Sequence, residues 1–425
     1  MNDWKQETWA VQGTYQPHNG QPRVLPLVQS TTYAYDTAQD IADLFDLKTP
    51  GHMYTRISNP TVAAFEEKMA RLEGGVGALA CASGQAANSF AVMNIARSGQ
   101  HVVASSTLYG GTFNLFVHTL ARYGIDCTFV DQNADAQVLR AAIRDTTRCL
   151  FAESLSNPGT EVLDFSVFAE VAREAGLPLI VDNTFPTPYL CTPLALGADI
   201  VTHSSTKYID GHACSLGGVI VDGGRFPWDN GRFPELTEPD PSYHGLSYTS
   251  AFGNSAYIVK ARVQLMRDLG AQLAPMNAWL SHLGLETLHL RMERHTANAT
   301  ALAQWLVGDE RVAWVKYPGL ATDPNSERAR RYLRGTGGVL TFGIKGGAPE
   351  GERFMNALRL ARIVVHVADV RTCVLHPASM THRQLSEEQQ RAAGVAPDLI
   401  RVSVGIEHID DILADFDQAL TAASR

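Results

Sequence analysis

Short apolar segments alternate with helical patterns from about residue 75 to residue 222. The apolar segments have consecutive apolar residues and end in glycine or polar residues, which is typical of strands covered by helices on both faces. The segments between them carry apolar residues at helical spacing, as in DFSVFAEVAREAG at 164–176. This alternation predicts an α/β domain with a mostly parallel, seven-stranded sheet, whose strands fall in GALACASG, HVVASS, CTFVDQ, RCLFAES, PLIVDNT, ADIVTHSS and LGGVIVDGG.

The pattern changes on both sides of this region. Residues 1–60 are rich in Thr, Tyr, Pro, Gly and Gln, and they predict an extended arm that packs on something else, a neighbouring subunit being the natural candidate. A Pro-, aromatic- and Gly-rich loop at 223–256 precedes long helical stretches, three further strand-like segments and a closing helix. We therefore predict three parts: an arm at 1–60, an α/β domain at 61–260 and a smaller α+β domain at 261–425.

Composition narrows the classes of partner. The 35 basic residues against 44 acidic ones give a net charge of −9, which argues against nucleic-acid binding through a basic face. The start of the chain lacks an apolar signal core, and no run approaches the roughly 20 apolar residues that span a bilayer. The six cysteines are scattered without a CxxC pair and are predicted to be reduced core residues. These features predict no membrane partner and a cytoplasmic location.

Polar residues follow the predicted strands, and ligands of open α/β sheets bind beyond the carboxyl ends of strands. Ser83, Gly84 and Gln85 lie between the first strand and a helix, where backbone N–H groups can hold a phosphate. The same junction also fits an ordinary turn and helix cap. Asp182 ends another strand and could pair with a protonated heterocyclic nitrogen, or could cap the next segment.

Lys207 follows an apolar strand within HSSTKYIDGH at 203–212. Burial lowers the pKa of a lysine and frees its amine to attack a carbonyl group, so a Schiff base becomes possible here. The hydroxyls of Ser204 and Thr206 could donate to a phosphate or could cap the turn. A solvated surface lysine is the ordinary alternative.

Five further residues carry groups suited to the same ligand. Tyr109 could stack on a flat ring and Asn157 could bond a ring hydroxyl, although both also fit packed turns. Tyr54 and Arg56 in the arm could reach an anion, with a solvated arginine as the alternative. Arg401 lies in the apolar LIRVSVG and needs an anionic partner, which is either a substrate carboxylate or a structural ion pair.

Other common site types lack support. No carboxylate or cysteine stands at a compact metal-ligand spacing from His203 or His212, so we predict no metal site. No GxGxxG follows the first strand, and no GxxxxGK[ST] occurs, which weakens the dinucleotide and P-loop hypotheses.

A set of short motifs spans nearly the whole chain: YTRISNPT (54–61), ASGQAA (82–87), LYGGTFNLF (108–116), SNPG (156–159), VDNTF (181–185), HSSTKYIDGH (203–212), HPASMTH (376–382) and IRVSVGIEHIDDI (400–412). In their order and spacing the chain resembles the cysteine and methionine metabolism family of fold-type I enzymes that use pyridoxal 5′-phosphate. The resemblance implies the fold type I transferase architecture. It also implies homotetramers built from catalytic dimers, in which the arm completes the partner's site.

The resemblance also implies the cofactor contacts. Lys207 would form the imine, Asp182 would pair with the pyridine nitrogen, and Asn157 would face the 3′ oxygen. Tyr109 would stack on the ring and is a candidate acid for the leaving group. The phosphate would be held by the remaining cofactor-binding positions, which are Ser83, Gly84, Gln85, Ser204 and Thr206, joined by Tyr54 and Arg56 of a neighbouring subunit.

The substrate positions implied by the resemblance include one departure. Arg401 would bind the substrate carboxylate, beside Asn157 and Tyr54. The family's sulfhydrylase branch typically reads close to ANVGDAK where this chain has VHVADVR, so His366 replaces a small amide or hydroxyl residue and Ala368 replaces a glycine. An imidazole at position 366 could narrow the pocket, add a proton donor or simply be accommodated.

Segments such as LTEPDPSYHGLSY and GLETLHLRMERH resemble the sulfhydrylase branch. This implies γ-replacement on an activated homoserine, O-acetyl-L-homoserine above all, with sulfide or a thiol, giving L-homocysteine or L-methionine and acetate. Alternatives are another acyl-homoserine and a γ-lyase, but methionine γ-lyases usually carry cysteine where this chain has Gly111. A non-catalytic binding protein would be expected to have lost Lys207 or Asp182, and both are present.

Overall fold

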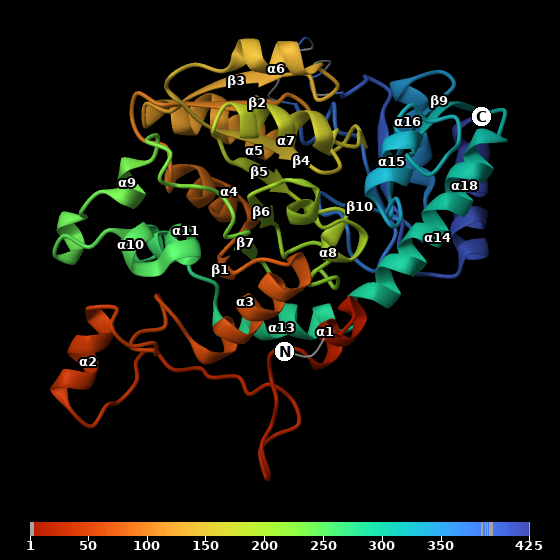
Figure 1. Ribbon diagram of the computed structural model, residues 1–425. Coiled ribbons are helices and arrows are strands. Elements are labelled where there is room, and N and C mark those ends of the chain that lie inside the picture. The colour runs from red at the N-terminus through yellow and green to blue at the C-terminus, as the bar shows by residue number, and fades with distance from the viewer. Residues whose placement is uncertain (1–3, 384–385, 387, 389, 391–393, 425) are drawn as a thin grey trace.

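The central sheet of the computed structural model has seven strands, and the structure describes residues 4–383, 386, 388, 390 and 394–424. The strand order is β1-β7-β6-β5-β4-β2-β3, with β7 antiparallel to β1 and β6 and the other pairs parallel (Figure 1). The mostly parallel, seven-stranded sheet predicted from the sequence is confirmed. Its strands are β1 (Gly77–Cys81), β2 (His101–Ser105), β3 (Asp126–Val130), β4 (Thr147–Glu153), β5 (Leu179–Asp182), β6 (Ile200–His203) and β7 (Gly218–Asp222).

Helices cover both faces of this sheet, which explains the unbroken apolar runs. Leu79 and Cys81 of β1 belong to a core with α4 and α11, whereas Ala78 and Ala80 belong to a core with α3 and α13. The helices of this domain and its connections are α3 (Pro60–Glu73), α4 (Gly84–Met93), α5 (Gly110–Asn114), η1 (Leu115–Leu120), α6 (Ala136–Ala142), α7 (Phe165–Glu174), α8 (Thr187–Leu190), η2 (Pro193–Leu196), α11 (Ala256–Lys260), η5 (Ala261–Met266), α12 (Arg267–Leu269) and α13 (Pro275–Glu286).

A second, five-stranded sheet forms the C-terminal region, in the order β10-β11-β12-β9-β8. Strands β9 and β12 fall in the predicted segments GGVLTFGIKGG and LIRVSVG, and β8 overlaps the predicted segment WVKYPG, whereas β10 and β11 were not predicted. Helices α14, α16 and α18 share an apolar core with the sheet. The elements are α14 (Leu288–Val307), β8 (Val312–Lys316), α15 (Ser326–Tyr332), β9 (Val339–Ile344), α16 (Ala348–Ala357), β10 (Arg362–Ile363), β11 (Cys373–Leu375), β12 (Ile400–Ser403) and α18 (Ile409–Ala423).

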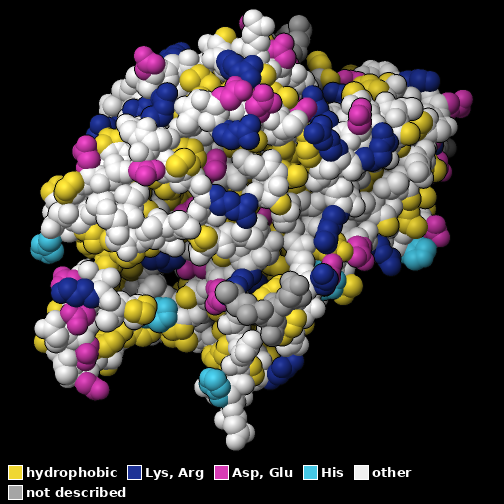
Figure 2. All heavy atoms as spheres, in the orientation of Figure 1, with side chains coloured by type: hydrophobic (Ala, Val, Ile, Leu, Met, Phe, Trp, Pro, Cys, Tyr) yellow, Lys and Arg dark blue, Asp and Glu magenta, His cyan; other side chains and the backbone are white. Residues whose placement is uncertain are grey.

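The N-terminal arm contains two helices that its composition did not predict. Helix α1 (Gln6–Gln12) packs on α3 and α13. Helix α2 (Ala38–Phe45) lies on a loop that projects from the body of the molecule (Figure 1 and Figure 2). A capping box at its start, with Thr37 and Asp40 each accepting the other's backbone N–H, stabilises α2. The boundaries predicted at residues 60 and 260 stay predictions.

Two other expectations need correction. The segment 223–256 is not a plain loop, because it holds the short helices α9 (Pro234–Thr237), η3 (Pro241–Tyr243), α10 (Tyr248–Phe252) and η4 (Gly253–Ser255). Proline stands at the first turn of α9 and η3, where its missing N–H costs nothing. All six cysteines are free thiols, but Cys214 is exposed and Cys127 is only half-buried. Across the described ranges, no helix is long and apolar enough to cross a bilayer.

Candidate active site

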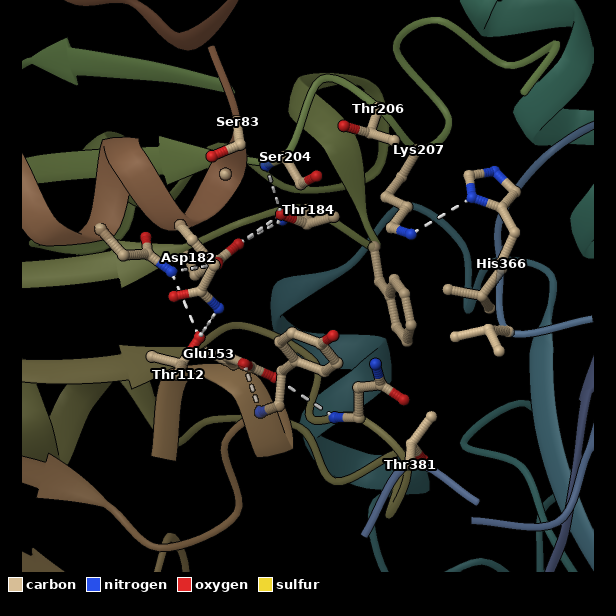
Figure 3. A pocket seen from close by; sticks show the side chains of 18 of the residues that line it. Ser83, Thr112, Glu153, Asp182, Thr184, Ser204, Thr206, Lys207, His366 and Thr381 are labelled. Atoms are coloured by element: carbon tan, nitrogen blue, oxygen red, sulfur yellow. Dashed lines mark hydrogen bonds between the residues drawn. The ribbon is translucent and has the colours of Figure 1, made fainter. Parts of the chain in front are cut away.

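A pocket of about 320 Å³ lies beyond the carboxyl ends of β4, β5 and β6, where the central sheet meets the segment 365–367 (Figure 3). Tyr54 and Arg56 are absent from its lining within this subunit. The structure brings together the other residues predicted from the sequence, which are Ser83, Gly84, Gln85, Tyr109, Asn157, Asp182, Ser204, Thr206, Lys207, His366 and Arg401.

The start of α4 forms one end of the pocket. Ser83 caps this helix by accepting the N–H of Ala86 at 3.1 Å, whereas the first N–H groups of a helix have no partner within it. Those of Gly84 and Gln85 therefore remain for a ligand beside them. A Cβ atom on Gly84 would lie only 2.6 Å from Cβ of Ser204, so the close approach of these two segments requires glycine. The result is an anion cradle with the positive end of the helix dipole behind it.

The loop before Lys207 is tied to neighbouring segments. The Thr206 hydroxyl both donates to the carbonyl of Gly217 and accepts its N–H, each at 3.1 Å, so Thr206 links this loop to the segment that leads into β7. The backbone N–H of Ser204 donates to Oγ1 of Thr184 at 2.8 Å, and Thr184 was not predicted as a site residue. Ser204 and Thr206 thus sit on a fixed loop that lines the pocket.

Asp182 is oriented by three donors. Nδ2 of Asn88 donates to Oδ2 at 3.1 Å, while the backbone N–H of Thr184, at 3.0 Å, and its hydroxyl donate to Oδ1. Donors of this kind stabilise a carboxylate and fix its direction. The bond from the Thr184 N–H also makes Asp182 the cap of the following turn, as one of the two hypotheses expected. Its pairing with a ring nitrogen stays a prediction.

Lys207 lies in a buried position in this pocket. Its pKa is lowered to about 8, first by burial and then by the positive charge of Arg401. Nζ lies 3.4 Å from Nδ1 of His366. A substantial share of this amine is therefore neutral, and nucleophilic, in mildly alkaline solution.

Glu153 is a buried carboxyl group that the sequence analysis missed. It ends β4 directly opposite Asp182 in the sheet, and it accepts the backbone N–H of Tyr109 at 2.7 Å and that of Asn157 at 3.2 Å. Burial and the charge of Asp182 raise its pKa well above the usual range. Glu153 thereby anchors the two segments that carry Tyr109 and Asn157.

Replacing Glu153 by glutamine is expected to lower the stability of the protein. The amide has one acceptor where the carboxyl group accepts at both oxygens, so one buried N–H loses its partner at a cost of about 1–3 kcal/mol. Thermal unfolding of Glu153→Gln should show a lower midpoint than the wild type, with the exposed Glu310→Gln as the matched control. Equal midpoints for the wild type and Glu153→Gln would contradict the anchoring role.

Tyr109 lines the pocket, and Gly111 lies close behind its ring. The Tyr109 side chain is 40% exposed, as expected for a ring that faces an open pocket. A Cβ atom on Gly111 would lie 2.5 Å from Cε1 of Tyr109 and 3.0 Å from Nε2 of Gln85. A cysteine at this position would therefore displace the tyrosine ring.

Arg401 is a buried arginine that lines the pocket. Its Nη1 donates to Oδ1 of Asn157 at 3.1 Å, and its Nη2 donates to the carbonyl of His366 at 3.5 Å. No acidic side chain within the described residues forms an ion pair with it. Burial lowers the pKa of this guanidinium. A buried cation with neutral partners is a receptor for an anionic group, which disfavours the structural ion pair.

Tyr54 and Arg56 lie outside the pocket of their own subunit. They line a separate hollow with Gln272, where Nη1 of Arg56 donates to the carbonyl of Arg267 at 2.6 Å. The guanidinium also lies 5.3 Å from the centre of the Tyr54 ring. Whether they serve a neighbouring subunit stays a prediction.

Comparison with known proteins decides the family. The family model described as Cys/Met metabolism PLP-dependent enzyme matches residues 7–421. The chain belongs to this family. It is therefore a pyridoxal phosphate-dependent enzyme of Cys/Met metabolism, and the resemblance that the motifs indicated is confirmed.

Individual relatives cover nearly the whole chain. O-acetyl-L-homoserine sulfhydrylase of Leptospira meyeri is 47% identical over 98% of this chain and 97% of its own length. Homocysteine synthase of Schizosaccharomyces pombe is 48% identical, covering 96% of this chain and 98% of its own. A crystal structure of a Campylobacter jejuni chain, assigned as an O-acetylhomoserine (thiol)-lyase and carrying a pyridoxyl-lysine phosphate, superposes with a TM-score of 0.95 at 35% identity, covering 98% of this chain and 100% of that one.

The residues present fit pyridoxal phosphate. The cradle at Gly84 and Gln85 suits a phosphate, Asp182 suits a protonated pyridine nitrogen, and Lys207 suits an aldehyde. Because Oδ1 of Asn157 faces Arg401, its Nδ2 remains as the donor for a ring oxygen. Within the described part of the chain, no group of three potential metal ligands occurs.

Uptake of the cofactor is expected to depend on pH. Only the neutral amine reacts with an aldehyde, and the pKa of Lys207 is lowered to about 8, so the reactive fraction grows as pH rises through this value. The rate at which absorbance of the bound cofactor develops in cofactor-free protein should increase between about pH 7 and 9 and then level off. A rate that keeps rising towards pH 10.5, the ordinary lysine value, would contradict this environment for Lys207.

Replacing Gly84 by alanine is expected to weaken cofactor binding by tenfold or more. The added methyl group would lie 2.6 Å from Cβ and 2.9 Å from Cα of Ser204, so the anion cradle has to open. Equilibrium titration of cofactor-free protein with pyridoxal phosphate measures the change. Gly308→Ala is the matched control, because its added methyl group would meet nothing closer than 3.5 Å. Unchanged affinity in Gly84→Ala would show that this cradle does not hold the phosphate.

Proposed function

We propose that this protein replaces the acetate of O-acetyl-L-homoserine with sulfide, giving L-homocysteine. The observation that carries the proposal is that one pocket holds both a lysine of lowered pKa and a buried arginine without an acidic partner among the described residues. The 47% identity to an O-acetyl-L-homoserine sulfhydrylase, over 98% of this chain, supports it. A γ-replacement on an amino acid needs both groups. The arginine receives the carboxylate, and the lysine carries the cofactor and then serves as a base.

Each residue then has a defined task. Arg401 binds the carboxylate of the amino acid and, through Oδ1 of Asn157, keeps that amide turned towards the cofactor ring. Bound pyridoxal phosphate supplies an electron-accepting ring that acidifies the Cα–H bond of the substrate. Nζ of Lys207, once free, takes that proton. Asp182, held by Asn88 and Thr184, keeps the positive charge on the ring nitrogen.

The tyrosine at the mouth has a task at the leaving group. Tyr109 lines the pocket with 40% of its side chain exposed, and its backbone is fixed by Glu153. Its hydroxyl is the proton donor to the departing acetate in this proposal. The pocket lining also includes the apolar side chains of Leu155 and Phe185, which reduce the number of polar groups that could hold water there.

A two-product assay tests the function. Purified protein with O-acetyl-L-homoserine and sulfide should form homocysteine and acetate in equal amounts, with little 2-oxobutyrate. Without sulfide, 2-oxobutyrate release reports γ-elimination, the reaction of the alternative lyase. Elimination that is equally fast with and without sulfide would overturn the proposal in favour of the lyase, and turnover only with another acyl-homoserine would change the substrate.

We also propose that the arm completes the site of a second subunit in a cytoplasmic homotetramer of catalytic dimers. Tyr54 and Arg56 lie outside the pocket of their own subunit, and among the described residues that line this pocket the only lysine is Lys207 and the only arginine is Arg401. The proposal assigns Lys207 to the aldehyde and Arg401 to the substrate carboxylate, so among these residues the cradle at Gly84 has no cation of its own. A phosphate dianion at that cradle needs a cation. A partner's arm would supply it.

Mixed subunits test the shared site. Arg56→Ala and Lys207→Ala should each be nearly inactive alone. Their co-expression should restore about a quarter of wild-type activity, because half of randomly paired dimers contain one site with both residues intact. No recovery, in dimers shown by mass spectrometry to be mixed, would place Arg56 in its own subunit's machinery.

A further inference from the structure

His366, Asp369 and Lys207 form a chain of polar contacts at the rim of the pocket. Nδ1 of His366 lies 3.4 Å from Nζ of Lys207, and Nε2 lies 3.6 Å from Oδ2 of Asp369. Figure 3 shows the imidazole facing the lysine amine across the pocket. The side chain of His366 is 22% exposed and that of Asp369 only 7%. Three titratable groups are thus aligned in a largely buried place.

The backbone around His366 fixes this arrangement. The carbonyl of His366 accepts from Nη2 of Arg401 at 3.5 Å. Ala368 adopts a left-handed conformation, with φ of +66°, and its N–H donates to Oγ of Ser403 at 2.8 Å. Oδ1 of Asp369 accepts the N–H of Arg371 at 2.7 Å, which leaves Oδ2 for the imidazole. The backbone on both sides of His366 and the carboxylate of Asp369 are therefore held in place.

The charges that face the imidazole define its resting state. Lys207 and Arg401 are positive, whereas Asp369 and Asp210 are negative. Burial, followed by the charge of Lys207, lowers the pKa of His366, so the ring is neutral near pH 7. Nε2 of His366 is buried and makes no hydrogen bond to a described residue, and Oδ2 of Asp369, at 3.6 Å, is the carboxylate oxygen that it faces. This carboxylate favours a hydrogen on Nε2, which presents the lone pair of Nδ1 to the lysine.

We propose that His366, supported by Asp369, is the proton acceptor for Lys207. The proton leaves the ammonium Nζ and binds Nδ1, which turns a lysine cation and a neutral imidazole into a neutral amine and an imidazolium. The total charge is unchanged, and the carboxylate of Asp369 stabilises the imidazolium through Nε2–H. The reverse transfer restores the starting state.

The relay matters for the proposed function, on which it rests. Loss of a γ-substituent requires removal of a proton at Cα and of a second one at Cβ. An amine that holds the first proton cannot take the second. Transfer to Nδ1 of His366, 3.4 Å away, returns Lys207 to its basic form within the pocket.

Hydrogen exchange at two carbons of one amino acid tests the relay. L-2-aminobutyrate has no γ-leaving group, so the cofactor-loaded enzyme in D₂O exchanges its Cα and Cβ hydrogens without turnover, and proton NMR follows both. In His366→Asn the amide can accept a hydrogen bond but cannot take a proton. We expect Cα exchange within about threefold of the wild type and Cβ exchange reduced tenfold or more.

Two variants complete the exchange experiment. Asp369→Asn should also slow Cβ exchange selectively, because the imidazolium loses its carboxylate. The exposed His408→Asn is the matched control and should match the wild type at both carbons. Equal slowing at Cα and Cβ in His366→Asn, or no slowing at either carbon, would overturn the relay.

A second readout needs no cofactor. Competitive acetylation of the cofactor-free protein over a range of pH, with the peptide containing Lys207 quantified by mass spectrometry, measures the titration of that amine. Two groups that share a proton titrate together, so the wild-type curve should be broader than a single-site curve and His366→Asn should give a single-site curve. Coincident curves would contradict proton sharing.

The outcomes separate this proposal from the proposed function. Exchange on L-2-aminobutyrate and acetylation of Lys207 both proceed without O-acetylhomoserine or sulfide. If the sulfhydrylase assay fails while Cβ exchange still depends on His366, the function is wrong and the relay stands. If homocysteine forms normally while exchange is independent of His366, the relay is wrong and the function stands.

Discussion

Lys207→Ala is expected to turn over O-acetylhomoserine at least about a thousandfold more slowly than the wild type. It should also lack the visible absorbance of the bound cofactor. The variant lacks the amine that holds the cofactor and the base that acts on the substrate. No other lysine among the described residues lines the pocket, so no second amine can replace that of Lys207. Steady-state assays with sulfide and absorption spectra of the purified variant measure both losses.

The exposed Lys345→Ala serves as the control for this variant and should behave as the wild type in both measurements. Circular dichroism should show that Lys207→Ala is folded, because alanine removes a buried amine whose pKa is already lowered to about 8. A folded Lys207→Ala protein that keeps wild-type turnover would refute the role of this lysine.

The second large effect concerns the carboxylate receptor. Arg401→Leu is expected to raise the KM for O-acetylhomoserine about 100-fold or more, because charged hydrogen bonds at a buried site contribute about 3 kcal/mol. The same change should leave the thermal midpoint close to that of the wild type. The guanidinium has only neutral partners among the described residues. Leucine removes a buried charge, and this gain offsets the loss of the hydrogen bond to Asn157.

Two further variants sharpen this prediction. Arg401→Lys keeps the charge but loses the bidentate fork, so its KM should lie between those of the wild type and Arg401→Leu. The exposed Arg330→Leu is the matched control. An unchanged KM in Arg401→Leu, or a collapse of thermal stability without any effect on KM, would mean that this arginine is structural.

Much of the fold could be predicted because buried segments have recognisable patterns of apolar residues. The seven strands of the central sheet are covered on both faces, so their sequences are runs such as LIVD at 179–182. Strands β10 and β11 were not predicted because they span only Arg362–Ile363 and Cys373–Leu375, which are too short to show the apolar pattern of a strand. The short helices of 223–256 escaped for the same reason.

The site divides along a similar line. Asp182 and Lys207 could be found because each follows an apolar strand, and the same rule would have found Glu153, the last residue of β4. Asn88 and Thr184 could not be found, because their importance lies in contacts with Asp182 that only the folded chain creates. The contact between Lys207 and His366 joins residues 159 positions apart, and no pattern along one sequence predicts it.

The covalent attachment of the cofactor tests the central claim most directly. The purified protein should be treated with borohydride, which fixes an aldehyde to the amine that carries it, and then digested for mass spectrometry. We expect the pyridoxyl phosphate mass on the peptide that contains Lys207, with fragment ions that place it on this residue. A modification confined to other lysines, in protein that catalyses homocysteine formation, would contradict the site described above.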